Sequence, residues 1–179
     1  MAWSNPSTKA VGSVLTAAEW NIQVANTDFL GQPPSVSIGK STEQAIATGT
    51  WTALQWSAQR WDNDSMWSST ASNRIDINTA GKYLATLNVT WNGSTLFNHY
   101  RIIGIGVGQT TNAYPNQGEE RRLSVVAGEQ VSQSISRIIN LTSTQYLRAM
   151  VYQDDGISRN VGHSTASSYP SLEVLWVSS

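Results

Sequence analysis

The stretch GKYLATLNVTW, residues 81–91, decides the fold. Every second side chain from Tyr83 to Trp91 is apolar or aromatic, and polar residues such as Thr86 and Asn88 occupy most positions between them. Successive side chains of a strand point to opposite faces of its sheet, so this period of two indicates an antiparallel strand with one buried face. We therefore predict a half-buried strand over residues 81–91.

The same period of two continues on both sides of this stretch, from Val36 to the C-terminus. The other predicted strands are residues 36–38, 45–46, 50–56, 74–77, 100–107 and 122–126, and three that are anchored by Val131, Ile135 and Ile139, by Leu147, Ala149 and Val151, and by Leu172, Val174 and Trp176. About eight to ten short strands with turns between them usually split into two packed sheets. The predicted fold class is all-β, an antiparallel jelly-roll β-sandwich.

The first 34 residues have a different pattern. Thr16 and Glu19 have the spacing of a capping box, in which each side chain accepts a hydrogen bond from the backbone N–H of the other residue. Leu15 and Trp20 flank this cap as a candidate hydrophobic staple. We expect a helix that begins after Thr16 and continues to about Asp28.

Gly31 ends the predicted helix, and Pro33 and Pro34 form a stiff spacer after it. The expected organisation is an N-terminal anchor over residues 1–34 and a β-sandwich head over residues 35–179. A helix of about a dozen residues is marginally stable alone in water. We therefore expect it to dock on another surface.

The charge balance and the residue types that are absent exclude several functions. The 179 residues include 11 Lys and Arg against 12 Asp and Glu, so no basic face for nucleic acid is expected. There is no Cys, which excludes disulfides, thiol catalysis and Cys-ligated metals. We find no apolar run of membrane-spanning length and no apolar core of a secretion signal near the start. The chain is therefore expected to be made in the cytoplasm and to have no membrane partner.

Residues with catalytic or metal-binding chemistry are sparse. His99 and His163 lie in polar, turn-like surroundings without a neighbour at ligand spacing. Asp62 and Asp64 superficially resemble the start of a calcium loop, but the later oxygen ligands are missing, so an Asx-rich turn is favoured. Residues 154–156, Asp-Asp-Gly, have the composition of a hairpin turn. We predict no catalytic residue, no cofactor and no metal site.

Four tryptophans, Trp51, Trp56, Trp61 and Trp67, follow one another closely. They cannot all lie on one strand face, so they are either core residues or partly an exposed patch, and patches of this kind mark interfaces. Both interpretations stay open. The residues of the candidate ligand or interface patch are Trp56, Trp61, Asp62, Asp64 and Trp67.

Residues 49–93 resemble the first half of the tumour-necrosis-factor-like and complement-globular-head jelly rolls. In those domains a Trp/Asp-rich hairpin precedes an Arg-Ile-x-Ile strand and a Gly-x-Tyr turn into a long core strand. The matching residues are Trp51, Trp56, Asp62, Arg74, Ile75, Ile77, Gly81, Tyr83 and Trp91, and residues 171–177 resemble the closing strand of the family. The resemblance implies a homotrimer, in which outward apolar residues such as Leu84 would be buried.

The N-terminal segment has a separate resemblance. Residues 3–6, Trp-Ser-Asn-Pro, together with residues 14–21 and 26–30, are similar to the start of many tailed-bacteriophage virion proteins. The resemblance implies attachment of the trimer to a phage particle, as a capsid decoration or a head fibre that contacts capsid or tail proteins. The expected virion-anchoring residues are Trp3, Leu15, Trp20, Ile22, Val24, Phe29 and Leu30.

Two other functions remain open. One is a receptor-binding tail-fibre knob that recognises host-surface saccharide with exposed Trp, Asn and Asp side chains. The other is a polysaccharide hydrolase that uses Asp62, Asp64 or Asp154. The favoured hypothesis is a non-enzymatic virion structural protein.

Overall fold

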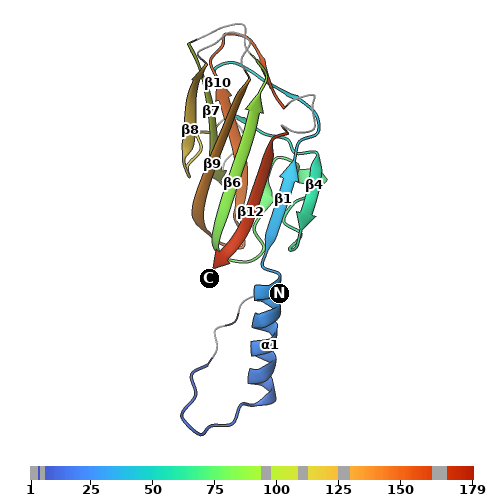
Figure 1. Ribbon diagram of the computed structural model, residues 1–179, viewed down its shortest axis with the longest axis vertical. Coiled ribbons are helices and arrows are strands. Elements are labelled where there is room, and N and C mark those ends of the chain that lie inside the picture. The colour runs from blue at the N-terminus through green and yellow to red at the C-terminus, as the bar shows by residue number, and fades with distance from the viewer. Residues whose placement is uncertain (1–3, 5–6, 94–97, 109–112, 125–129, 163–168) are drawn as a thin grey trace.

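The computed structural model describes residues 4, 7–93, 98–108, 113–124, 130–162 and 169–179. Two antiparallel sheets lie face to face as a jelly roll, and one helix extends from one end of the sandwich (Figure 1). The all-β fold class is therefore confirmed. The predicted turn that follows residue 126 lies outside the described residues.

The larger sheet has the strand order β2, β11, β6, β12, β1, β4. β11 and β12 pair with different parts of one edge of β6, and β9 pairs with its opposite edge. Every pair in this sheet is antiparallel. The bounds are β1 (Ser35–Gly39), β2 (Gln44–Ile46), β4 (Ala58–Asp62), β6 (Gly81–Trp91), β9 (Val131–Leu141), β11 (Arg159–Val161) and β12 (Ser171–Ser178).

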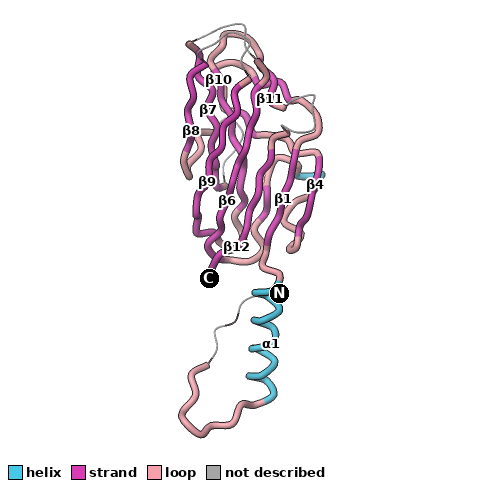
Figure 2. Tube along the Cα trace, in the orientation of Figure 1, coloured by secondary structure: helices cyan, strands magenta, loops and turns pink. Residues whose placement is uncertain are grey.

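The smaller sheet has the order β3, β10, β7, β8, and β5 also pairs with β10. Its bounds are β3 (Thr52–Ala53), β5 (Ile75–Asp76), β7 (His99–Val107), β8 (Glu119–Ser124) and β10 (Tyr146–Gln153). A single 3-10 turn, η1 (Ser69–Ala71), connects β4 to β5. Figure 2 shows the two layers of strands and the separate helix.

The strand predicted over residues 81–91 is β6, with the same bounds. It pairs with β9 along its whole length and with β12 from Lys82 to Asn88. Its odd-numbered side chains, from Tyr83 to Trp91, are buried between the sheets. The period of two in this stretch therefore places a central strand and one wall of the core.

Two strands were missed, β4 and β11. β4 has the sequence AQRWD, which does not alternate, and it pairs only with β1 at the edge of the larger sheet. β11 has only three residues. The expected strand over residues 50–56 is reduced to β3, and the strand expected over residues 122–126 begins earlier, at Glu119. Edge strands need only one buried or paired side, so their sequences carry a weaker pattern.

The helix α1 (Ala17–Gly31) begins where the capping box predicted. Thr16 accepts a hydrogen bond from the N–H of Glu19, and Glu19 accepts one from the N–H of Thr16 at 2.9 Å. Glu19 is also paired with Lys9 at 2.5 Å. The bond with Lys9 and the bonds with Thr16 lower the pKa of Glu19 from 4.5 to about 2. The cap is therefore fully charged above pH 4.5 and is lost as the pH falls through about 2.

The helix contacts the sandwich through its last turn. The ring of Phe29 is buried edge-on against Trp176 of β12, with 4.7 Å between the ring centroids. The side-chain amide of Asn26 makes two hydrogen bonds with the backbone of Ser4 and so ties the segment before the helix to α1. The rest of α1 points away from the head (Figure 1). Phe29 is thus the residue of α1 that packs into the main core of the head.

Candidate functional site

An apolar row crosses the outer face of the larger sheet. In the register of the sheet Leu84 of β6 lies opposite Ile138 of β9 on one side and Leu175 of β12 on the other. These side chains are 37%, 67% and 43% exposed, respectively. Three large aliphatic side chains in adjacent strands form a contiguous exposed patch, and such patches mark binding surfaces.

A shallow hollow extends this row toward β4. It has a volume of about 300 Å³, and Trp61, Leu84 and Leu175 contribute to its lining. Trp61 is 47% exposed and is the aromatic member of the patch. Farther from α1 the same face becomes polar, and one side-chain hydrogen bond joins Thr86 to Ser136. Lys82 follows on the other side of the row, so the apolar part occupies the half of the face nearer the helix without reaching its end.

The N-terminal segment carries a second exposed apolar surface. Of the expected anchoring residues, Leu15, Trp20, Ile22, Val24 and Leu30 are all exposed. Phe29 differs, because it is buried against the chain's own head and holds α1 in place. Trp3 lies outside the described residues.

The Trp/Asp-rich segment is mainly structural. Both carboxylate oxygens of Asp62 accept backbone hydrogen bonds, from Asp64, Met66 and Trp67, at 2.9 to 3.2 Å. This is the Asx-type turn that the sequence favoured over a calcium loop. Asp64 accepts a hydrogen bond from Thr79. The pKa of Tyr83 is raised mainly by burial of that side chain and secondly by the charge of Asp64.

The candidate tryptophan patch is divided by the fold. Trp56 is buried in the main core, and Trp67 is half-buried against it. Only Trp61 reaches the outer face of the larger sheet, where it joins the apolar row. The structure therefore does not bring these three residues together as one exposed patch.

His99, Asp154 and Asp155 come close together where β7 begins and β10 ends. His99 Nδ1 lies 3.4 Å from Asp154 Oδ1. The Asp155 carboxylate already receives Arg101 Nη1 and Nη2 at 2.5 and 2.6 Å, and Arg159 Nε as well. Two guanidinium charges on one carboxylate disfavour a cation there. His163 lies outside the described residues.

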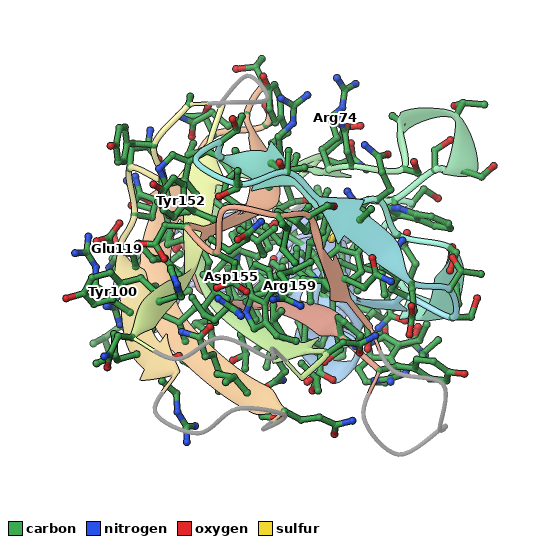
Figure 3. The ribbon with its side chains drawn as sticks, turned by 90° about the horizontal axis from the view of Figure 1, so that it is seen from above. Arg74, Tyr100, Glu119, Tyr152, Asp155 and Arg159 are labelled. Atoms are coloured by element: carbon green, nitrogen blue, oxygen red, sulfur yellow. The ribbon has the colours of Figure 1, made fainter. Side chains whose placement is uncertain are left out.

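Sequence reasoning missed the buried polar network around this ion pair. Arg101 and Asp155 are almost completely buried, and Arg101 also lies over the ring of Trp91, 5.6 Å from its centroid. Gln133 accepts a hydrogen bond from the indole of Trp91 and donates one to the carbonyl of Arg101. Figure 3 shows Asp155 and Arg159 side by side, as seen from above. The sequence carried one signal for the burial of Arg101: residues two apart on a strand share a face, so Arg101 lies on the same inward face as Ile103.

Comparisons by sequence give no relative: no family model matches the chain, and no curated protein matches it. Comparison with solved structures gives matches. The globular domain of a zebrafish complement 1qA protein matches with a TM-score of 0.55 and 7% identity, over 80% of this chain and 97% of that one. The Eiger TNF of S. frugiperda matches with a TM-score of 0.60 and 8% identity, over 81% of this chain and 92% of that one.

The fold is that of the TNF/C1q jelly rolls. This confirms the fold that the resemblance of residues 49–93 implied. Identities this low establish the TNF/C1q-like architecture alone. The function of this TNF/C1q-like chain must therefore be argued from its own surfaces. The helix α1 is too short and too polar to cross a bilayer, and the described residues contain no other helix that is long and apolar enough.

Proposed function

We propose that the protein is a non-enzymatic virion structural protein. Its TNF/C1q-like head forms a homotrimer through the outer face of the larger sheet, and its N-terminal segment attaches the trimer to a phage particle as a capsid decoration or head fibre. The observation that carries the proposal is the separation of two exposed apolar surfaces, one on the head and one on the projecting helix.

The surface on the head suits self-association. The row of Ile138, Leu84 and Leu175 carries no charge, and burial of such side chains contributes roughly 25 cal/mol per Å² before the costs of association. TNF/C1q-like domains are typically homotrimers, and the row lies on one face of one sheet. A closed ring of three copies buries the row in each copy.

The surface on the helix suits attachment. β6 begins and β12 ends at the end of the head from which α1 projects (Figure 1), and Leu84 and Leu175 lie in the halves of these strands nearer that end, so three helices emerge near one another in the trimer. Trp20 and Val24 are exposed and share one helix face. Three weak contacts on one rigid trimer give an avidity that a single helix lacks. The similarity of the segment to phage virion proteins supplies the kind of partner.

Deletion of residues 1–31 tests the anchor. We expect the truncated protein to remain a folded trimer and to be absent from purified virions, because it keeps the apolar row and loses the exposed helix. The measurement is immunogold labelling and blotting of virions from cells that express each form. In the full-length chain, joint replacement of Trp20 and Val24 by Ala should reduce labelling.

The matched control is Asn21→Ala, which changes an exposed polar residue on the same helix. It should label virions like the unchanged protein. Labelling of particles by the truncated form at the full-length level would refute the anchor assignment.

A further inference from the structure

We propose that the outer face of the smaller sheet binds one neutral pyranose ring of a glycan. The site is a hollow of about 150 Å³ built around Trp51 and three tyrosines. It lies on the opposite sheet from the apolar row, so it does not depend on the trimer or on the anchor. Of the four tryptophans considered from the sequence it contains Trp51, and it contains no residue of the candidate patch of Trp56, Trp61, Asp62, Asp64 and Trp67.

Three strands build the floor and walls of the hollow. In the register of the sheet Tyr152 of β10 lies opposite Ile102 of β7, which lies opposite Arg121 of β8. Trp51, just before β3, packs with Ile102 in a small cluster outside the main core. Tyr100 adds a second aromatic wall, and Figure 3 shows Tyr100 and Tyr152 on the same flank of the molecule.

Tyr114 forms the open side of the hollow. Its ring lies 5.5 Å from that of Trp51 by centroids, and 73% of its surface is exposed. The chain around Tyr114 is fixed to the sheet, because Pro115 packs against Gly104, where a Cβ would lie only 2.4 Å from Pro115 Cγ. Asn116 holds the same turn by hydrogen bonds with both backbone groups of Val107. The aromatic wall is thus held in place before any ligand arrives.

The indole N–H of Trp51 favours a ligand that carries a hydrogen-bond acceptor. Trp51 lines the hollow and is 4% exposed, and its Nε1 is buried without a hydrogen-bond partner among the described residues. A buried donor without a partner costs free energy, so a ligand oxygen that displaces the side chains covering this atom would remove that cost. The ligand must therefore combine an acceptor with an apolar face that packs on tyrosine rings.

Charge and size select a neutral sugar over a cation. Arg121 lies over the ring of Tyr100, 5.0 Å from its centroid, and would repel a cationic ligand from the aromatic walls. Asp154 at the rim offsets this charge. The volume is smaller than the ~300–1,000 Å³ of sites for larger ligands, so one ring fits. A pyranose offers an apolar C–H face and hydroxyl groups at its edge.

The position also suits recognition of an outside surface. β7 begins and β10 ends at the end of the head opposite α1, and Tyr100 and Tyr152 lie near those strand ends (Figure 1). A protein held by its helix would present this hollow outward.

Saturation-transfer NMR of the full-length protein tests the site. The probes are the methyl α- and β-glycosides of glucose, galactose, mannose and N-acetylglucosamine, each at about 10 mM because one ring in a shallow site binds with a Kd near the millimolar range. We expect transfer to the ring protons of at least one glycoside. Tyr114→Ala should weaken that binding about tenfold.

Two further variants sharpen the result. Trp51→Phe keeps an aromatic ring and removes the donor, so it should weaken binding about fivefold. Ile157→Ala, which removes an exposed apolar side chain outside the hollow, should leave binding unchanged. Thermal melting establishes that each variant is folded. The proposal is overturned if no glycoside shows transfer, if Tyr114→Ala binds like the unchanged protein, or if tetramethylammonium binds in the hollow and the glycosides do not.

Discussion

Arg101→Met should destabilise the head by about 3–5 kcal/mol. The substitution keeps most of the side-chain volume but removes the bidentate partner of the Asp155 carboxylate. Asp155 is only 2% exposed. Of the two guanidinium groups that pair with Asp155, the one of Arg159 then remains. The guanidinium group of Arg101 also lies over the ring of Trp91, 5.6 Å from its centroid, so the substitution removes this contact as well.

Urea unfolding of Arg101→Met beside the unchanged protein measures this effect. The matched control is Arg60→Met, because Arg60 also pairs with an acidic residue, Glu173, but the pair is exposed and 3.6 Å apart. Exposed pairs contribute little, so we expect a change within about 0.5 kcal/mol for the control. A loss below about 1 kcal/mol for Arg101→Met would show that the buried pair does not stabilise the head.

Leu84→Glu should dissociate the proposed trimer into monomers. Leu84 is the middle residue of the apolar row, and three copies of the assembly would each bury a carboxylate without a partner. The penalty is several kcal/mol for each buried charge, so association should weaken by about a thousandfold or more. Size-exclusion chromatography with light scattering measures the oligomeric state.

Leu123→Glu is a close control for this variant. Leu123 has the same exposed fraction as Leu84, 37%, but it lies on β8 of the smaller sheet. We expect Leu123→Glu to keep the oligomeric state of the unchanged protein. If Leu84→Glu elutes as the unchanged protein does, the row does not form the interface.

The sequence predicted the elements whose signal is local. β6 has alternation over its whole length because one side of the strand faces the core, and α1 begins at Thr16 because the cap needs only two residues three positions apart. β4 and β11 could not be predicted in this way, because their pairing depends on β1, β2 and β6 elsewhere in the chain.

The functional surfaces also divide into one with a local sequence signal and two that depend on residues distant in the chain. The exposure of the helix residues was predictable from their segment, whereas the apolar row and the aromatic hollow join residues from different strands. Leu84 and Ile138 are partners only in the folded sheet, and so are Ile102 and Tyr152. Trp51 was noticed in the sequence as one of four tryptophans, but only the fold separates it from Trp61 and places it with tyrosines.

Sedimentation equilibrium of the full-length protein tests the central claim most directly. That claim is that the exposed row on the larger sheet is a contact between copies of this chain. The account predicts a single species with three times the chain mass of 19.5 kDa, at micromolar concentration and physiological salt. A species that keeps the mass of one chain at every concentration would contradict it.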